Sequence, residues 1–162
     1  MTPNDRASVN LSYTNATFSD KNSPIALGGG AFVTFGQYFT RDAIPNVTPF
    51  AANFGYDHII RLPADSTLTL HGDARFMSAH YLVNVADSDI MAGRAPYLRL
   101  HGEWIGDLGA TWASANNRFT VTGYGRNIGN NQYKTTAFVQ DPNILTAPHD
   151  PLTYGVVLAV RF

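Results

Sequence analysis

The sequence predicts an all-β fold: an antiparallel up-and-down segment of a transmembrane β-barrel, with about six strands and an incomplete barrel. Two observations lead to this prediction. Apolar and polar residues alternate with a period of two in six separate runs, and the connections between the runs alternate between short and long. Successive side chains of a strand point to opposite faces, so each run has one apolar face and one polar face. A helix is excluded because the apolar residues recur at i, i+2 and i+4.

Three of the runs lie in the N-terminal half of the chain. Ser8 to Phe18 opens with an apolar residue at every second position from Val9. Phe50 to Leu62 carries mainly aromatic and aliphatic residues at even positions and has Asp57 at an odd one. Thr67 to Ser78 repeats the pattern, with threonine, histidine, aspartate and arginine on its odd face. Each run therefore predicts one strand.

The other three runs complete the pattern. Tyr97 to Trp112 is the longest, and its leucines and tryptophans share the even face opposite arginine, glutamate and aspartate. Arg118 to Ile128 sets phenylalanine and valine against threonine, tyrosine and arginine. Leu152 to Phe162 has an unbroken apolar stripe that ends on an aromatic residue. The charged residues within the six runs all fall on the polar face, which indicates that the other face meets lipid.

The connections predict which end of each strand faces which side of the membrane. Short turns and long loops that alternate are typical of outer-membrane barrels, in which turns face the periplasm and loops face outward. The N-terminus, both short turns and Phe162 are therefore expected on the periplasmic side. The short connections are Pro63 to Ser66 and Ala113 to Asn117, and the long ones are Asp20 to Pro49, Ala79 to Pro96 and Gly129 to Pro151.

Composition excludes several other classes of protein. The 162 residues suffice for one domain, and a formal net charge of −1 gives no electrostatic basis for binding nucleic acid. The absence of cysteine excludes a disulfide scaffold and a cysteine-based metal site. The sequence has no stretch of eighteen apolar residues, so it predicts no transmembrane helix.

Two features indicate that the chain is part of a larger assembly. Met1 is followed by Thr-Pro-Asn-Asp-Arg, which lacks the basic and apolar regions of an export signal. Six strands are also fewer than the eight of the smallest usual barrel, and unpaired edges in lipid cost several kcal/mol for each backbone group. We therefore expect this sequence to be a piece, and we expect the missing strands to come from elsewhere.

Specific residues resemble a known family. Arg118 to Tyr133 (RFTVTGYGRNIGNNQY) is similar to the penultimate-strand motif of TonB-dependent outer-membrane receptors, and Pro151 to Phe162 (PLTYGVVLAVRF) is similar to their final strand, with Leu152 in place of the usual arginine. Leu11 to Phe18 and Pro49 to Tyr56 resemble strand starts of the same region. The resemblance implies that residues 1–162 correspond to the C-terminal part of the receptor barrel, about the last six of 22 strands. Nothing matches the plug domain.

The resemblance implies a role in active uptake, performed by the parent protein. That parent would sit in the outer membrane of a Gram-negative cell and import a ferric siderophore, a cobalamin or an oligosaccharide. Its partners would be outer-membrane lipid, the plug, the remaining barrel strands, TonB and the barrel-assembly machinery. The alternatives are a stand-alone outer-membrane pore or adhesin assembled from several chains, and a hydrolase with polar residues at the rim. No cofactor is expected.

Charged residues of the polar faces are predicted to form a structural network that lines the lumen, because a lumen charge needs a partner or water. The alternative for Arg126 and Asn127 is ligand contact. No catalytic, cofactor-binding or metal-binding residue is expected. His71, Asp73 and His101 could form a metal site or part of a hydrolase triad, but both lack further convergent groups. The expected network comprises Asp57, Asp73, Arg75, Arg99, Glu103, Asp107 and Arg126.

Aromatic residues near the strand ends fit belts at the two bilayer interfaces. Trp112 and Phe119 lie near the short turns, and Phe50 and Tyr97 lie near the long loops. The first long loop contains Gly28 to Gly30 and is unusually apolar, which suits either ligand contact or packing against other loops. The resemblance further implies that the terminal strand carries an assembly signal at Tyr154 and Phe162.

Overall fold

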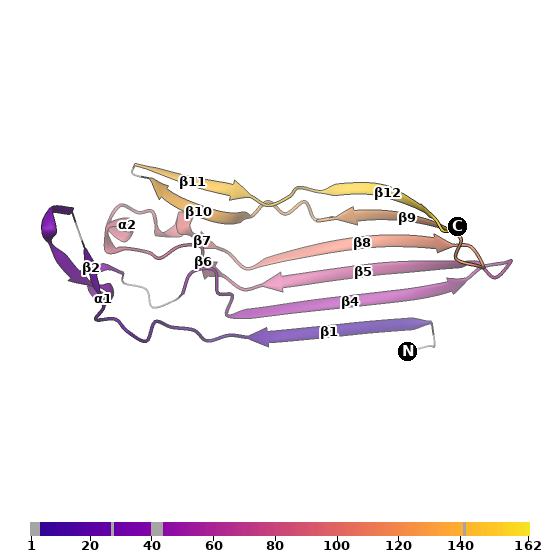
Figure 1. The fold of residues 1–162 in the computed structure, drawn as a ribbon, viewed down its shortest axis with the longest axis horizontal. Helices are drawn as coiled ribbons and strands as arrows, with labels where there is room; N and C mark the ends of the chain where they lie inside the picture. The colour runs from indigo at the N-terminus through magenta and orange to yellow at the C-terminus, as the bar shows by residue number, and fades with distance from the viewer. Residues whose placement is uncertain (1–3, 27, 40–43, 141) are drawn as a thin grey trace.

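The protein, described here by a computed structural model, is built around one antiparallel sheet (Figure 1). The structure describes residues 4–26, 28–39, 44–140 and 142–162, so the predicted lack of an export signal at Met1 to Pro3 lies outside the described residues. The sheet order is β1-β4-β5-β8-β9-β12, in which every strand pairs with the next one in this list. The strands are β1 (Asp5–Tyr13), β4 (Phe50–Arg61), β5 (Thr67–Met77), β8 (Glu103–Ala113), β9 (Phe119–Arg126) and β12 (Thr153–Val160).

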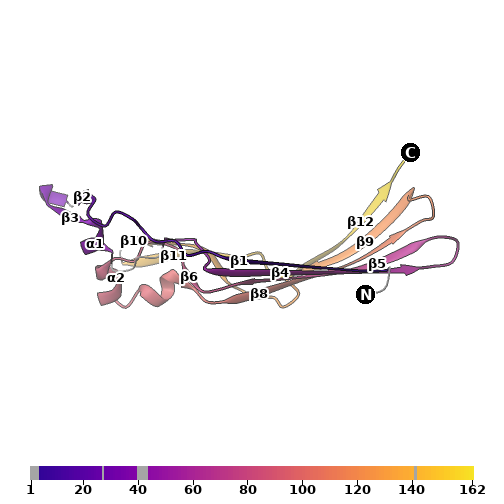
Figure 2. The same ribbon diagram turned by 90° about the horizontal axis from the view of Figure 1, so that it is seen from below.

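This order confirms the predicted all-β, up-and-down architecture. All five neighbouring pairs of the sheet are antiparallel. Short turns join β4 to β5 and β8 to β9, so no crossover is needed. Within the described part of the chain the sheet stays open, with β1 and β12 as its edges. Figure 2 shows the sheet edge-on and strongly bent toward β12.

The two short turns lie at the same end of the sheet as both termini, whereas the long connections gather at the other end (Figure 1). The β4–β5 turn places Ala64 and Asp65 at φ values of 58° and 54°, which match a turn that follows the right-handed twist of a hairpin. In the β8–β9 turn, Asn117 has a φ of 53°, a conformation that asparagine tolerates well. These turns keep adjacent strands in register.

The long connections contain structure of their own. The first contains the hairpin β2–β3, the short helix η1 and the helix α1, and the second contains the pair β6–β7 with α2 and η2. The third contains the hairpin β10–β11. Their bounds are β2 (Pro24–Ala26), η1 (Gly28–Gly30), β3 (Phe32–Thr34), α1 (Phe35–Tyr38), β6 (His80–Tyr81), α2 (Asp87–Met91), η2 (Ala95–Leu98), β7 (Arg99–Leu100), β10 (Lys134–Gln140) and β11 (Asn143–Pro148).

The prediction of one continuous strand from Tyr97 to Trp112 is wrong. Tyr97 and Leu98 lie in η2, Arg99 and Leu100 form β7, and the long strand β8 begins only at Glu103. The physical reason is the partner strand, because β5 ends at Met77 opposite Glu103 and offers no backbone to residues further upstream. The two residues of β7 pair instead with β6 in the same connection.

The first predicted strand is also shifted toward the N-terminus. β1 spans Asp5–Tyr13, whereas the alternation suggested Ser8 to Phe18. Beyond Tyr13 the chain leaves the sheet, and the Phe18 ring packs against Phe35 of α1 with ring centroids 4.5 Å apart. The other four strands agree with their predicted runs to within two residues at each end.

The hydrophobic core lies at the loop end of the sheet. It joins the second long connection, the start of β8 and the third long connection, so the loops fold as a packed unit. Leu98 is fully buried, and Val85 is 1% exposed. The core residues are Leu82, Val85, Leu98, Leu100, Ile105, Tyr133 and Ala137.

Candidate functional site

Strand register brings charged residues together on the polar face of the sheet. Asp73 of β5 lies directly opposite Asp107 of β8, and Asp57 of β4 lies opposite His71 of β5. All four occupy odd positions, so they share one face of the sheet. The period-two alternation therefore places these side chains in neighbouring rows across β4, β5 and β8.

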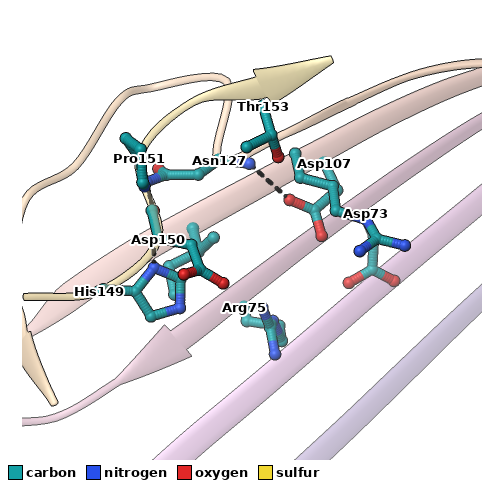
Figure 3. Close-up of a pocket in the computed structure, with 10 residues that line it drawn as sticks. Asp73, Arg75, Asp107, Asn127, His149, Asp150, Pro151 and Thr153 are labelled. Carbon is teal, nitrogen blue, oxygen red and sulfur yellow. Dashed lines mark hydrogen bonds between the residues drawn. The ribbon is translucent and has the colours of Figure 1, made fainter. Parts of the chain in front are cut away.

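These rows border a polar cavity of about 450 Å³ near the loop end of the sheet (Figure 3). Strands β5, β8 and β9 supply its floor, and the segment that leads into β12 supplies its opposite wall. A smaller hollow of about 350 Å³ shares Asp73, Asp107 and Arg126 with it and continues over β8 and β9. The larger cavity is lined by Asp73, Arg75, Ile105, Asp107, Arg126, Asn127, His149, Asp150, Pro151 and Thr153.

Asn127 fixes the wall of this cavity. Its side chain is 3% exposed and donates to the backbone oxygens of Asn131 and Asp150, both at 3.0 Å, while its side-chain oxygen accepts from the Asn131 N–H at 3.0 Å. Its own backbone N–H donates to the Asp107 carboxylate at 2.8 Å. A φ of 50° turns the chain out of β9 at this point. Asn127 therefore ties the end of β9 to β8 and to the start of β12.

Polar contacts also link the strands beside the cavity. The His71 ring Nδ1 lies 2.5 Å from an Asp57 carboxylate oxygen, and the hydroxyls of Thr111 and Thr122 are 3.0 Å apart. The Arg126 guanidinium lies 5.3 Å from the centroid of the Tyr124 ring. These contacts lie in neighbouring rows of the polar face, so polar contacts link its side chains from strand to strand.

The cavity carries both signs of charge without close ion pairs. Among the described residues, no arginine or lysine nitrogen comes within 4.0 Å of the Asp73 or Asp107 carboxylates. Two carboxylates directly opposite each other repel, and water or a cationic partner would relieve that repulsion. The cavity is therefore suited to hold water, or a polar chain segment that contributes donors.

One tyrosine links the cavity to the core of the loops. Tyr133 belongs to that core, and the His149 ring from the cavity wall stacks on it with centroids 4.3 Å apart. Burial raises the pKa of the Tyr133 phenol above its usual range; nearby Arg75 opposes the shift, and three carboxylates, led by Glu103, add to it. The phenol therefore stays protonated and neutral beside the cavity at neutral pH.

The structure brings together four of the seven residues of the expected network: Asp73, Arg75, Asp107 and Arg126 line the cavity. Asp57 lies in an adjacent row, where it contacts His71. Glu103 begins β8 opposite Met77. Arg99 lies outside the large sheet, in β7, with its guanidinium 5.9 Å from the Tyr81 ring centroid.

Sequence reasoning missed the two titratable residues on the far wall of the cavity, His149 and Asp150. They lie in the third long connection, which has no periodic pattern to place them. The only sequence signal is the Pro151 that follows them, which marks a chain reversal before the last strand.

The suggested metal or hydrolase site does not come together. His71 contacts Asp57, while His101 lies between β7 and β8, away from the residues that line the cavity. In the described part of the chain, no group of three or more His, Cys, Asp or Glu residues is arranged to hold a metal ion.

The opposite face of the sheet is apolar and exposed. On β8, Trp104 is 51% exposed and Leu108 is 54% exposed, whereas Ile105 between them is 3% exposed. Near the loop end, the Phe76 ring packs against Trp104 with centroids 5.0 Å apart, and Phe54 stacks on the same Trp104 at 5.9 Å. None of the described helices is long and apolar enough to cross a membrane.

One polar cluster interrupts the apolar face near the short turns. The carboxylate of Asp5 lies 2.7 Å from the Tyr56 hydroxyl and 2.7 Å from the His58 Nδ1. Asp5 lies directly opposite His58, so the three residues share the face of Val9 and Phe54. A polar patch therefore interrupts the apolar face at the start of β1, while Ile60 continues the apolar row of β4 beyond it.

The fold matches part of a known receptor structure. The ferric yersiniabactin uptake receptor FyuA from Yersinia pestis aligns with 74% of this chain at a TM-score of 0.62 and 17% sequence identity. The chain covers only 17% of that receptor. At the level of the fold, this agrees with the resemblance that the motifs of the last two strands indicated.

A second receptor structure shows a weaker similarity. BauA, the ferric preacinetobactin receptor from Acinetobacter baumannii, aligns with 71% of this chain at a TM-score of 0.47 and 21% identity, and 15% of its own length is covered. No protein-family model and no curated protein matches the sequence.

Proposed function

We propose that this chain forms part of the barrel wall of an outer-membrane, TonB-dependent receptor that takes up a scarce ligand. The observation that carries the proposal is the open, six-stranded up-and-down sheet with one exposed apolar face and one charged face, in a fold shared with part of FyuA. The apolar face contacts lipid, and the charged face with its cavity lines the interior. Because the structural neighbour is a ferric siderophore receptor, a ferric siderophore is the first ligand to test.

The positions of aromatic and polar residues on the apolar face support a membrane location. Tyr13 and Tyr154 lie at the loop ends of the two edge strands, β1 and β12. The row of paired residues that contains Tyr154 crosses the sheet and meets β1 at Ala7. Ala7 lies about 20 Å from Tyr13 along β1, so the line that joins the two tyrosines is inclined to the rows of paired residues. At the other end, the polar cluster around Asp5 interrupts the apolar face at the start of β1, near the short turns. The offset of about 20 Å between Tyr13 and Ala7, taken over five inter-strand spacings of about 4.8 Å, gives a strand tilt of about 40°. Outer-membrane barrels have strand tilts of about 35 to 45°.

The same proposal assigns an orientation and partners. The short turns and the C-terminus face the periplasm, and the packed long connections face outward, because barrels place their longer loops outside. The edges β1 and β12 pair with the remaining strands of the receptor, a plug fills the interior, and TonB supplies the drive. The barrel-assembly machinery inserts the chain. The proposal assigns it no catalytic role, no cofactor and no nucleic-acid partner.

Uptake measurements in the natural host test this function. The gene that encodes this chain is deleted and restored, and uptake of radiolabelled iron is measured with a panel of siderophores, with and without a proton uncoupler. Labelled cobalamin and oligosaccharides complete the panel. We expect deletion to abolish uptake of one ligand, the restored gene to recover it, and the uncoupler to block it. Recovery of the protein in the soluble fraction, or unchanged uptake of every ligand, would contradict the proposal.

A further inference from the structure

A second cavity lies away from the sheet, between two of the long connections. This loop cleft has a volume of about 440 Å³, which is within the usual range for small-molecule sites. The segment between α2 and η2 forms one side, and the hairpin β10–β11 forms the other. Its lining is Ala92, Gly93, Arg94, Tyr97, Lys134, Pro142, Asn143, Ile144 and Thr146.

Two cations line the loop cleft, and they differ in whether a carboxylate of the described residues lies close to them. The Arg94 guanidinium lies 3.5 Å from the Asp89 carboxylate. The Lys134 ammonium donates to the backbone oxygen of Tyr97 at 3.1 Å, and within the described ranges no carboxylate oxygen lies within 4.0 Å of it. A backbone carbonyl satisfies one of the three ammonium donors without neutralising the charge. Lys134 therefore leaves a positive charge in the cleft.

An aromatic surface lies beside this charge. The Tyr97 side chain is 60% exposed, and the Lys134 ammonium lies 5.6 Å from the centroid of its ring. An ammonium held between a ring face and a carbonyl stays close to one position. A ligand group that entered the cleft would meet the Lys134 ammonium, the flat ring of Tyr97 and the guanidinium of Arg94.

We propose that the loop cleft binds an anionic oxygen group, a carboxylate or a phosphate, through Lys134 and Arg94. The group accepts hydrogen bonds from the two remaining Lys134 donors and from the guanidinium, and apolar parts of the ligand lie against Tyr97. Such a group could come from a soluble anionic compound or from a phosphorylated lipid of the surrounding leaflet. This inference rests on the loop contacts alone and does not depend on the proposed uptake function.

Calorimetric titration of the complete natural gene product in detergent tests the site. One titration uses ferric citrate as the soluble carboxylate, and another uses micelles that contain lipid A as the phosphorylated lipid. We expect one of the two to bind, and we expect Lys134→Gln to weaken that binding by about tenfold, since it removes a charge-assisted contact while a donor to Tyr97 remains. The titration that responds identifies the source of the anion.

Two variants serve as controls. Lys134→Arg keeps the charge and should bind within about threefold of the wild type, which separates charge from loss of folding. Lys21→Gln removes the only other lysine, in the first long connection, and should leave binding unchanged. Wild-type affinity of Lys134→Gln for both probes, or no binding of either probe by the wild type, would overturn the cleft proposal. Either result would leave the uptake function standing, because deletion and restoration of the gene test that separately.

Discussion

At the scale of single residues, the side chain of Asn127 holds three parts of the chain together at the cavity. We predict that Asn127→Ala lowers the free energy of unfolding by about 1 to 3 kcal/mol, because it removes the hydrogen bonds of a buried side chain to the partly buried backbone groups of Asn131 and Asp150. Urea titration in detergent, followed by tryptophan fluorescence, measures the change. Asn130→Ala is the matched control, because Asn130 has a similar φ of 47° but is exposed and makes one side-chain bond, to the Leu152 N–H. Equal losses in the two variants would contradict this role.

Gly155 marks a close approach between β12 and β9. A Cβ at Gly155 would lie 2.7 Å from the Tyr124 hydroxyl oxygen and 2.9 Å from its ring carbon Cζ, so the ring covers the glycine. We predict that Gly155→Ala destabilises the protein by about 1 to 3 kcal/mol, since overpacking displaces the ring. Gly123→Ala is the control, because nothing lies within 4 Å of a Cβ there. The loss should disappear when Tyr124→Ala is added to Gly155→Ala, and a persistent loss would refute the steric cause.

The raised pKa of Tyr133 predicts how the free energy of unfolding changes at alkaline pH. Burial favours the neutral phenol in the folded protein, so its stabilising contribution is complete below the ordinary tyrosine pKa near 10. As pH rises above that value, the unfolded chain ionises first and the free energy of unfolding falls. We predict that Tyr133→Phe makes this fall between pH 9 and about 12 shallower. Unfolding titrations across that range measure it, and an unchanged slope in the variant would show that another group causes the fall.

The candidate site could be predicted in part from the sequence. Alternation places Asp73 and Asp107 on the polar faces, but their direct pairing depends on the register between β5 and β8, which are joined by a long connection and not by a short turn. The other wall could not be predicted, because His149 and Asp150 are positioned by the Asn127 side chain and by stacking on Tyr133. Such contacts join residues far apart in the sequence and leave no periodic signal.

At the scale of elements, the long strands were predictable and the structure of the loops was not. The strand predictions succeed because one face of each strand is apolar along most of its length, a pattern that only a strand can satisfy. The elements within the long connections are two to seven residues long, too short for a period to be visible. Those of the second and third connections are held by the loop core around Leu98, to which β8 and β10 both contribute. The break between β7 and β8, just before Glu103, could not be predicted either, because β7 is only two residues long.

The last strand carries a prediction about assembly. Phe162 follows β12 and is fully exposed, as expected if a partner outside the described residues contacts it. We predict that deletion of Phe162 lowers the yield of protein in outer-membrane fractions more than it lowers ligand affinity of the protein that inserts. Quantitative immunoblotting of the fractions, with Val156→Ala in the same strand as a comparison, measures this. A normal yield without Phe162 would count against an assembly signal at this end.

At the scale of the whole molecule, the sheet is amphipathic from edge to edge. Its apolar face is exposed along β1, β8 and β12, and its polar face carries the charged rows and the cavity. The core of the protein lies under the long connections and leaves both faces of the sheet free for other contacts. This arrangement is stable when lipid covers one face and a wet interior covers the other, with the edges β1 and β12 paired by further strands.

A spin-label scan of β8 tests this account most directly, because residues 1–162 contain no cysteine and each site can be labelled alone once any cysteine elsewhere in the gene product is replaced by serine. Labels are placed in the natural gene product in outer-membrane vesicles, and collisions with oxygen, which dissolves in lipid, are compared with collisions with a water-soluble nickel chelate. We predict a period of two, with labels at even positions favouring oxygen and labels at odd positions favouring the nickel chelate. Loss of the alternation, or its reversal, would contradict a membrane-spanning wall with a polar interior. The scan covers Asp107, Leu108, Gly109, Ala110, Thr111 and Trp112.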